Sequence, residues 1–428
     1  MRVWLITVGE PLPTDDANNR LLRTGFLANL LYEKGHDVLW WTSSYDHNKK
    51  KHRSHADTTL AVNDRYHIRL LHSVGYKRNV SIQRLINHYM IARKFIKSAG
   101  FEKKPDIILC SLPTLELSLA AVEYGRKEQI PVILDMRDMW PDIFENVFPL
   151  WSRKFVRLLL LPMFQTVRSA CKNATAIVGI TQDFVDWGVN HAGRSHSSFD
   201  KEFPLAYSNL TPSHEAMLEA AKFWERHKVN KENKEFNVCF FGYMGRQIEL
   251  ETVIEAARKL LAQKRKIRFI LCGDGDQFSQ YKEMARGCDN IIFPGWVGAP
   301  EIWALMRLSS AGLAPYRSSK DFQASLPNKS IEYLSAGLPI ISSLKGALQQ
   351  LLSVHDCGIT YDNTDSDQLV KTLKDLYDDG VRLDIMSGNA SALYGERFVS
   401  EKVYGHMVEY LEAVYENSRN QVVLMDGK

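Results

Sequence analysis

The segment LPNKSIEYLSAGLPII, residues 326–341, holds the residue types best suited to binding a phosphorylated ligand. Pro327 favours a turn, so we expect a helix that begins near Ser330. Lys329 can then bind a phosphate together with the N–H groups at that helix start. Glu332, in the first turn, can accept hydrogen bonds from the two vicinal hydroxyls of a ribose. A glutamate that only favours the helix dipole explains this spacing equally well.

The segment FGYMGR, residues 241–246, is a second candidate for phosphate binding. Gly242 and Gly245 allow a phosphate to approach backbone N–H groups, and Arg246 can bind it through two hydrogen bonds. The segment matches neither the dinucleotide fingerprint G-x-G-x-x-G nor the phosphate loop G-x-x-x-x-G-K-[ST], and the GDGD run at 273–276 completes neither pattern. Alone, it is a weak indication of a phosphate site.

Two further loops follow apolar runs in the first half of the chain. The loop DMRDMWPD, residues 135–142, combines Arg137 and Asp138 with two more acids, and such charges are costly to bury unless they are paired. A structural Arg–Asp network explains this composition, but a binding or catalytic loop is our preferred interpretation. The loop GEPLPTDD, residues 9–16, fits either the rim of a ligand site or a surface connection.

The elements that must position these loops follow from apolar periodicity. Residues 2–8 read as a buried strand, residues 18–34 as a helix that Gly35 ends, and residues 36–42 as the next strand. Such a β-α-β unit builds a parallel sheet with right-handed crossovers. The pattern continues with strands at 107–110, 131–135 and 176–180, helices at 115–125 and 151–172, and a polar loop over 186–204.

The same alternation restarts near residue 236, after a charged helical stretch at 213–234. It predicts strands at 236–242, 267–273, 290–293, 311–315 and 339–342, and helices at 250–263, 278–286, 301–308 and 330–336. We therefore predict an α/β protein with two Rossmann-like domains, whose loops at the carboxyl ends of the strands bind ligands. The predicted divisions are a first domain 1–205, a helical connection 206–235, a second domain 236–399, and a segment 400–428 whose helix at 400–416 packs back toward the first domain.

Composition excludes several classes of function. The 428 residues are 45% hydrophobic and 24% charged, as in an ordinary globular protein. The net charge is +4, with +7 over residues 1–205 (28 Lys and Arg against 21 Asp and Glu) and −3 over the remainder (26 against 29), too small a bias to indicate nucleic acid. The six cysteines form no C-x-x-C pair, so we expect reduced core thiols and no zinc site or disulfide.

We expect a cytoplasmic protein. The first nine residues, MRVWLITVG, lack the apolar length and cleavage site of a signal peptide. The longest aliphatic run, residues 158–164, contains a proline and is far shorter than the ~20 residues of a spanning helix.

Taken together, the loops resemble those of family 4 retaining glycosyltransferases with the GT-B fold, over nearly the whole chain. The segment PNKSIEYLSAGLPII resembles the family pattern P-x-K-x-x-E-Y-x-x-x-G-x-P-I-I, and FFGYMGR, VIEAA, LCGDG and PGWV support the match. The loop DMRDMWP resembles the R-D-x-W-P loop of a subgroup that assembles bacterial surface polysaccharides. The resemblance implies two parallel sheets that face a central cleft.

The resemblance further implies a nucleotide-diphosphate sugar held mainly by the second domain. Glu332 would bind the ribose hydroxyls, and Arg246 and Lys329 would neutralise the departing diphosphate, so that no metal or other cofactor is needed. Trp296 and Val297 would border the base. The donor-binding residues expected in full are Gly9, Glu10, Gly242, Gly245, Arg246, Trp296, Val297, Asn328, Lys329, Ser330 and Glu332.

Two positions depart from the family pattern. Ala324 stands where many members carry a first glutamate that touches the sugar, and Arg137, followed by Asp138, stands where many carry a histidine. The R-D-x-W-P subgroup commonly shows both changes, which leave the sugar and the acceptor side open. In the mechanism that the resemblance suggests, the acceptor hydroxyl attacks the anomeric carbon on the face that the diphosphate leaves. The catalytic candidates are Asp138, Arg137, Arg246 and Lys329.

Enzymes of that subgroup act on lipid-linked acceptors at the inner membrane face, and two local features fit such a partner. Residues 48–53, NKKKHR, form a basic loop, and residues 151–158, WSRKFVRL, open an amphipathic segment with cationic and aromatic side chains. A solvated loop and a core-packing helix explain these features equally well. Peripheral attachment to an anionic membrane is therefore a hypothesis.

The resemblance predicts transfer of a hexosyl or N-acetylhexosaminyl group from a UDP-sugar, or a GDP-sugar as second choice. The acceptor would be lipid-linked or a saccharide, in the biosynthesis of bacterial O-antigen, capsule or exopolysaccharide. A sugar-nucleotide 2-epimerase would use the same fold and donor without an acceptor. A non-catalytic nucleotide-sugar-binding protein also fits, given Ala324. A nicotinamide-dependent dehydrogenase fits less well, because the glycine fingerprint is missing.

Overall fold

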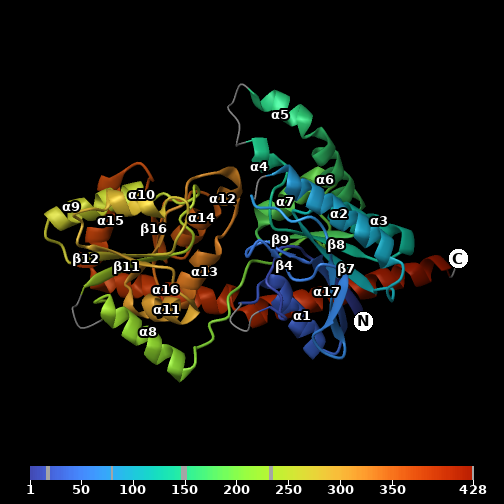
Figure 1. The fold of residues 1–428 in the computed structure, drawn as a ribbon, viewed down its shortest axis with the longest axis horizontal. Coiled ribbons are helices and arrows are strands. Elements are labelled where there is room, and N and C mark those ends of the chain that lie inside the picture. Colours follow the sequence, from blue (N-terminus) through green and yellow to red (C-terminus); the bar gives the residue numbers. More distant parts are fainter. Residues whose placement is uncertain (16–19, 79–80, 146–151, 231–234, 427–428) are drawn as a thin grey trace. The chain divides into compact units, whose positions relative to one another are not determined.

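The computed structural model of the chain describes residues 1–15, 20–78, 81–145, 152–230 and 235–426. The chain divides into two compact units: unit 1 comprises Met1–Pro204 and Ser400–Lys428, and unit 2 comprises Leu205–Val399. Each unit has its own β-sheet flanked by helices (Figure 1). No helix in the described ranges is long and apolar enough to cross a bilayer.

Unit 1 is built on an eight-stranded sheet with the strand order β10-β9-β8-β7-β1-β2-β6-β5. Neighbouring strands are parallel except at the edge, where β5 runs antiparallel to β6. The strands are β1 (Arg2–Ile6), β2 (Asp37–Ser43), β5 (Thr58–Ala61), β6 (Tyr66–Leu71), β7 (Ile107–Leu112), β8 (Val132–Met136), β9 (Ala176–Gly179) and β10 (Lys201–Glu202). A separate antiparallel pair joins β3 (Tyr45–Asp46) to β4 (Lys51–His52).

Helices cover both faces of this sheet (Figure 1). The chain steps from β1 to β2 in one direction and from β6 through β7, β8 and β9 in the other, so right-handed crossovers put the connecting helices on opposite faces. On one face, α1 (Arg23–Glu33) packs against α17 (Ser400–Asp426). On the other face, each helix packs on the next in the order α2 (Ile82–Ala99), α3 (Leu115–Glu128), α6 (Leu161–Asn173) and α7 (Gln182–Ala192).

Two predictions for unit 1 are wrong in detail. The polar stretch 186–204 is not all loop, because α7 continues to Ala192 and buries Val185 and Val189 on one face before Gly193, with φ of +65°, ends it. The amphipathic segment 151–172 is not one helix: α5 (Arg153–Leu159) and α6 meet at Leu160, next to the proline that opens α6. Trp151 and the start of the expected helix at Asn18 lie outside the described residues.

Unit 2 contains a six-stranded parallel sheet with the order β13-β12-β11-β14-β15-β16. The strands are β11 (Phe236–Phe241), β12 (Ile267–Cys272), β13 (Ile291–Gly295), β14 (Ala311–Ala314), β15 (Ile340–Ser342) and β16 (Gly358–Thr360). The first five match the predicted strands to within two residues at each end. The sixth was not predicted, and neither were the helices α12 (Lys320–Ala324), α14 (Ala347–Val354), α15 (Ser366–Asp378) and α16 (Gly380–Arg397).

The predicted helices of unit 2 are α9 (Glu251–Ala262), α10 (Phe278–Met284), α11 (Ala299–Leu308) and α13 (Asn328–Ser335). The charged stretch at 213–234 forms α8 (His214–Arg226), which packs against α11 and buries Trp224. The indole Nε1–H of Trp224 donates to the Glu301 carbonyl at 2.9 Å. α8 is therefore part of unit 2, although the sequence suggested a connection at 206–235.

Candidate functional site

Each sheet has one position where the strand order reverses. It lies between β1 and β7 in unit 1, and between β11 and β14 in unit 2. Loops from the two strands at such a point run to opposite faces of the sheet, so a crevice opens at their carboxyl ends, where ligands of this fold class bind. Three of the four segments singled out in the sequence follow strands at or beside these two positions, namely β1, β8 and β11, and the fourth forms α13 between β14 and β15.

In unit 2, the loop after β11 meets the start of α13. Gly242 directly follows β11 with φ of +140°, and a Cβ added there would lie 3.0 Å from Lys329 Nζ. Glycine therefore satisfies both the backbone conformation and the space that the ammonium group needs. Lys329 Nζ lies 3.8 Å from the centre of the Phe240 ring and 5.5 Å from that of Tyr316, so aromatic faces stabilise the cation.

The surroundings of Lys329 make its charge sensitive to a bound anion. Burial lowers the pKa of Lys329 to about 7, and the nearby Glu332 carboxylate only partly offsets this effect. A phosphate group that docks beside Nζ stabilises the charged form and restores the ammonium. An anionic ligand at this site therefore raises the fraction of Lys329 that is charged.

α13 begins two residues earlier than we expected, because Pro327 caps it and Asn328 is its first residue. Lys329 consequently lies in the first turn, and Glu332 lies in the second rather than the first. The effect of the helix dipole falls off within the first turn, so the purely structural explanation of Glu332 is weakened. Ser330 is buried, and its hydroxyl has no hydrogen-bond partner among the described residues.

The strand ends beside Gly242 are also glycines. The Gly242 N–H donates to the Cys272 carbonyl at 3.1 Å, and the Gly273 N–H donates to the Gly295 carbonyl at 2.7 Å. Gly273 has φ of +135°, and a Cβ there would lie 1.9 Å from the Gly242 carbonyl oxygen. The carboxyl ends of β11, β12 and β13 therefore approach one another closely, and glycines there have no side chains to separate them.

The remaining candidates in unit 2 differ in exposure. Trp296 follows β13 and is 73% exposed, whereas Val297 is buried. Arg246 is exposed in the loop after β11, and Gly245 is buried beneath the Tyr243 ring. Asn328 is exposed at the start of α13. The structure thus brings Gly242 and Lys329 into contact, and leaves Arg246, Trp296 and Asn328 open to solvent.

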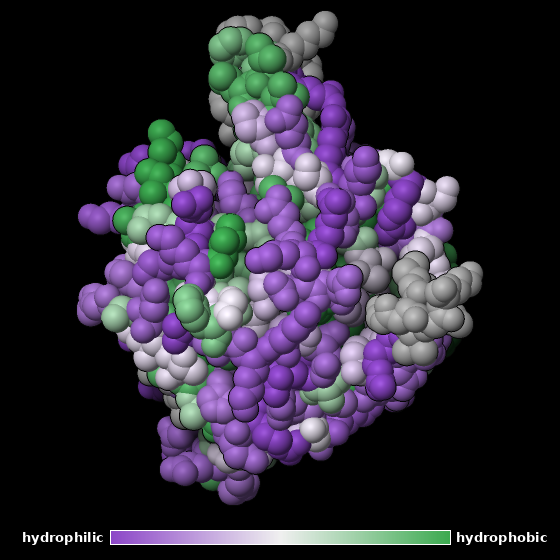
Figure 2. All heavy atoms as spheres, turned by 90° about the vertical axis from the view of Figure 1, so that its right-hand side faces the viewer, coloured by the Kyte–Doolittle hydropathy of each residue, from purple (hydrophilic) through white to green (hydrophobic). Residues whose placement is uncertain are grey.

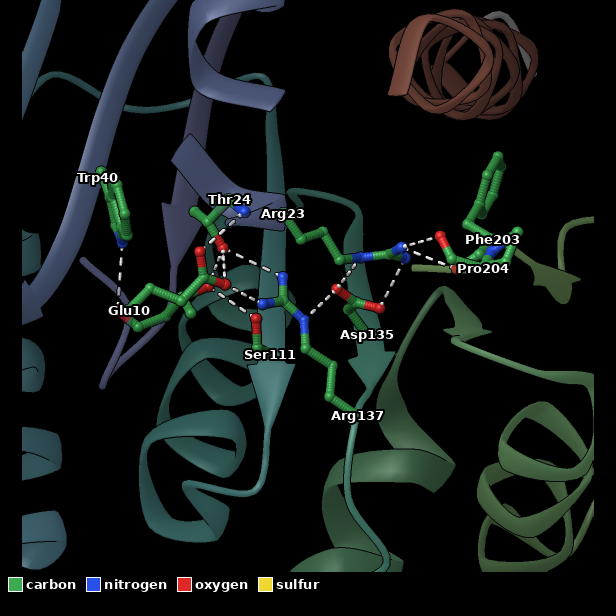
Figure 3. A network of polar contacts seen from close by, with 10 residues as sticks. Glu10, Arg23, Thr24, Trp40, Ser111, Asp135, Arg137, Phe203 and Pro204 are labelled. Carbon is green, nitrogen blue, oxygen red and sulfur yellow. Dashed lines mark hydrogen bonds and ion pairs between the residues drawn. The ribbon is translucent and has the colours of Figure 1, made fainter. Parts of the chain in front are cut away.

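In unit 1, the corresponding position is filled by a closed network of charges (Figure 3). Arg23 on α1 donates from Nε and Nη2 to the two Asp135 oxygens at 2.9 and 3.0 Å. Its Nη1 donates to the carbonyls of Phe203 and Pro204 at 2.7 and 3.1 Å. Arg137 donates from Nε to Asp135 Oδ2, which also accepts from Arg23 Nε, at 2.7 Å, and from Nη1 to Glu10. The positive charges of the two arginines thus balance the negative charges of the two carboxylates.

Thr24 completes the network around Glu10. The Thr24 N–H and hydroxyl donate to the Glu10 carboxylate at 3.0 and 2.8 Å, and Arg137 Nη2 donates to the Thr24 hydroxyl at 3.1 Å. Burial alone would raise the pKa of Asp135, but Arg137 and Arg23 outweigh it and hold the pKa below its usual value. This geometry favours the structural-network explanation of Arg137 and Glu10 over the donor-binding and catalytic roles that we preferred. Gly9, with φ of +95°, forms the turn that directs Glu10 inward.

Asp138 points to different neighbours from Arg137. Its carboxylate accepts a hydrogen bond from the Met139 N–H at 2.9 Å. Burial lowers the pKa of Arg84, and Asp138 is one of the nearby groups that oppose this change. The Arg84 guanidinium lies 4.6 Å from the centre of the Trp140 ring, so Arg84 on α2 covers the Asp138 loop.

Sequence reasoning missed Arg84 and two neighbours, the buried His88 and the half-buried His47. Burial lowers the pKa of His88 to about 3 and that of His47 to about 4, so both imidazoles are neutral at pH 7. The His47 Nδ1 lies 2.7 Å from the Tyr76 hydroxyl. The signal was available: Arg84 and His88 stand four residues apart on the inward face of α2.

The basic loop at 48–53 is partly tied into the fold. Arg53 forms ion pairs with Asp15 at 2.7 Å and with Asp46 at 3.0 Å and is only 12% exposed. Lys50 Nζ lies 4.9 Å from the centre of the Tyr76 ring. A fully solvated basic loop is therefore the wrong description of this segment.

All six cysteine side chains are buried and unpaired. Among the described residues, no three His, Cys, Asp or Glu side chains are grouped so that they could hold a metal ion.

Comparison with known proteins shows which family and which structures the chain resembles. Residues 235–379 match the model of the family described as glycosyl transferases group 1. The chain is similar in structure to sucrose-phosphate synthase from Thermosynechococcus elongatus, with a TM-score of 0.70 and 14% identity over 97% of this chain and 99% of that one. It is equally similar to an alpha,alpha-trehalose 6-phosphate synthase from Burkholderia multivorans, with a TM-score of 0.70 and 11% identity over 98% of each chain.

A third similar structure is that of HepE from Anabaena in complex with UDP-glucose, with a TM-score of 0.62 and 14% identity over 96% of this chain and 100% of that one. No curated protein sequence matches the chain significantly. The structural matches show the GT-B fold, and the family match lies within the unit that holds Lys329 and Glu332. The chain is therefore a glycosyltransferase with the GT-B fold, and residues 235–379 of its second unit match the model of the glycosyl transferases group 1.

Proposed function

We propose that the chain transfers a sugar, with retention of anomeric configuration, from a nucleotide-diphosphate sugar to a lipid-linked or saccharide acceptor in bacterial polysaccharide assembly. The observation that carries the donor half of this proposal is the pairing of Gly242 with Lys329 at the switch point of unit 2. The N–H groups at the start of α13 and the half-buried Lys329 offer a diphosphate both hydrogen-bond donors and a cation, and glycines at the strand ends leave it space. Glu332, one turn along α13, provides the carboxylate for the ribose hydroxyls.

The same groups account for the chemistry. Charge builds up on the diphosphate as the glycosidic bond breaks, and Lys329 beside the strand ends neutralises it without a metal. A lysine that is only partly charged before the ligand binds gains its full charge as the diphosphate docks, as the depressed pKa of Lys329 implies. A uridine donor is our first choice and guanosine the second; the UDP-glucose held by HepE, which has this fold, supports the first.

Unit 1 supplies the acceptor side in this proposal. Asp138 orients the acceptor hydroxyl or the sugar, because it stands in the loop that follows β8 at the carboxyl edge of the sheet. Arg137 acts as a positioning residue, since its donors hold the loop that carries Asp138. The resemblance of this loop to R-D-x-W-P supports an acceptor in surface-polysaccharide synthesis and peripheral attachment at the inner membrane face.

The donor is tested by thermal-shift titration with UDP, GDP, ADP, TDP and CMP. A ligand that binds only the folded protein stabilises it and so raises the melting temperature. At a ligand concentration of a hundred times the Kd, the stabilisation is about 2.7 kcal/mol. We expect UDP to stabilise the wild type and to have no effect on Glu332→Ala. Stabilisation by none of the five nucleotides would remove the main support for the transferase site.

The acceptor-side role of Asp138 is tested by Asp138→Asn, which keeps the shape of the side chain and removes its charge. We expect turnover with a sugar acceptor to fall about a hundredfold, the effect usual for a lost acid–base or orienting group. Nucleotide stabilisation in the thermal-shift assay should stay unchanged. Normal turnover of the variant would exclude Asp138 from the reaction.

A further inference from the structure

α2 carries a stripe of apolar side chains on its solvent side. The stripe consists of Ile82, Leu85, Ile86, Tyr89 and Ile96, which are 76, 38, 45, 56 and 53% exposed. The opposite side of the helix buries Ile91 and Phe95 and packs against α3. A helix at the surface of a globular domain normally has one apolar face, which packs on the core. The fold of unit 1 therefore leaves the second face of α2 unexplained.

The charges within the segment that carries this stripe all have one sign. Residues 65–101 contain no Asp or Glu, and their basic residues are Arg65, Arg69, Lys77, Arg78, Arg84, Arg93, Lys94 and Lys97. Lys77, Arg78, Arg93 and Lys97 are exposed, and with the residues that the structure describes they form no ion pair. The stripe is thus an apolar surface bordered by unpaired cations.

α5 repeats this composition. Phe155, Leu158 and Leu159 are each 64% exposed, and of the α5 side chains that the structure describes only Val156 is buried, so the core-packing explanation of this segment is wrong for α5. Residues 146–182 contain no Asp or Glu, and their basic residues are Arg153, Lys154, Arg157, Arg168 and Lys172. Figure 2 shows hydrophobic side chains gathered at the top of the view, the height at which Figure 1 places α5.

Both surfaces belong to the edge of unit 1 that carries Asp138. α2 follows β6, and α5 follows β8 and α4 (Asp142–Glu145), so the start of α2 and the whole of α5 lie at the carboxyl edge of the parallel sheet. Arg84, between Ile82 and Leu85, reaches inward to Trp140 in the Asp138 loop. At its start, α2 therefore presents apolar side chains to solvent on one side and contacts the proposed acceptor loop on the other.

We propose that the exposed faces of α2 and α5 form one docking surface for an anionic lipid bilayer. This inference rests on the proposed function, since it places the Asp138 loop beside a lipid-linked acceptor. Leucine, isoleucine and aromatic side chains enter the acyl boundary of a bilayer, and the bordering cations bind the headgroups of anionic lipids. The absence of acids from residues 65–101 and 146–182 removes the repulsion that such a surface would otherwise meet.

A second copy of this chain fits the surface poorly. In a two-fold dimer the same patch lies on both sides of the interface, so Lys77, Arg78, Arg93 and Lys97 would face their own copies. Like charges across an interface oppose association. Charge complementarity therefore selects the bilayer.

Sedimentation with vesicles tests the proposal on the full-length chain. We expect the chain to bind vesicles of phosphatidylcholine mixed with phosphatidylglycerol, to bind pure phosphatidylcholine vesicles at least about tenfold more weakly, and to be released by salt. The double variant Ile82→Glu/Ile86→Glu should lower binding to the mixed vesicles about tenfold or more, since it removes apolar contacts and adds repulsion. Phe155→Glu/Leu158→Glu should have the same effect.

The matched control is Val381→Glu/Ile385→Glu on α16 in unit 2. These side chains are 73 and 55% exposed and stand four residues apart, like Ile82 and Ile86, so the substitutions add the same charges to an equally exposed helix. The control should bind vesicles as the wild type does. Equal binding by the α2 variant and the wild type, or equal binding to neutral and anionic vesicles, would overturn the proposal.

Two further measurements separate the possible failures. Light scattering that shows a wild-type dimer, and a monomer for Ile82→Glu/Ile86→Glu, would assign the surface to a second copy instead. UDP stabilisation in the thermal-shift assay is independent of vesicles. A chain that binds UDP but no vesicles therefore overturns only the docking surface, whereas a chain that binds vesicles but no nucleotide overturns the proposed function.

Discussion

The two units use the same topology around their switch points and fill them in opposite ways. In unit 1, two arginines and two carboxylates satisfy one another in a closed, buried network. In unit 2, glycines line the strand ends and a single lysine is held over aromatic rings with a lowered pKa. The comparison teaches that charge at a switch point does not by itself identify a ligand site; what matters is whether the charges are already satisfied.

The strongest test of this contrast removes one carboxylate from unit 1. Asp135→Ala leaves Arg23 and Arg137 buried with one partner fewer, so we expect a loss of about 3–5 kcal/mol in the free energy of unfolding. Chemical denaturation measures it. Glu219→Ala is the control, because it breaks the exposed Lys222–Glu219 pair on α8 and should leave stability unchanged. A small effect of Asp135→Ala would mean that the network is not structural.

Removal of Lys329 in unit 2 should lower the rate of sugar transfer and leave stability unchanged, in contrast to Asp135→Ala. Lys329→Met keeps the aliphatic length of the side chain and removes a charge that is costly to bury, so the unfolding free energy should not fall. Transfer should drop about a hundred- to a thousandfold in kcat/KM, the usual result of deleting one group that stabilises a developing anion. Steady-state kinetics with the donor that the nucleotide titration identifies provides the measurement. A large loss of stability with intact kinetics would reverse the assignment of the two units.

The pH dependence of nucleotide binding gives a smaller and more specific test. Because the pKa of Lys329 is about 7 in the free protein and a bound diphosphate favours the ammonium, UDP affinity should be fully developed below pH 7 and fall as the pH rises above it. The fall is limited to about tenfold per pH unit. Lys329→Met should lack this slope, and the difference between the two profiles removes the titration of UDP itself. Identical profiles would show that Lys329 does not contact the diphosphate.

Much of the fold could be predicted because its strands are continuous apolar runs. The run VCFF in β11 and the run LITV around β1 each restart a β-α pattern, and both read directly from the sequence. The helix α7 was missed because polar residues cover its outer side and hide the spacing of Val185 and Val189. The outward stripe of α2 was missed for the opposite reason: a helix that is apolar on two sides has no clear polar face.

The site was predictable where the partners are close in the chain. Lys329, Ser330 and Glu332 lie within one segment, and only the start of α13 was misplaced, by two residues. The role of Arg137 was not predictable, since its partner Glu10 stands 127 positions away and belongs to a different loop. Local composition shows that charges are present, whereas the tertiary fold decides which of them pair.

The division of the chain between the units has a consequence for its synthesis on the ribosome. Unit 2 is one continuous stretch, Leu205–Val399, and can fold as soon as that stretch has emerged. Unit 1 needs α17, which packs on α1 and stacks Tyr404 on Phe26, and Tyr404 is added only after all of unit 2 has been translated. Unit 1 therefore cannot finish folding, and one face of α1 stays uncovered, until α17 has been synthesised. Nascent chains stalled before Ser400 should bind holding chaperones through that face, and release should follow translation of α17.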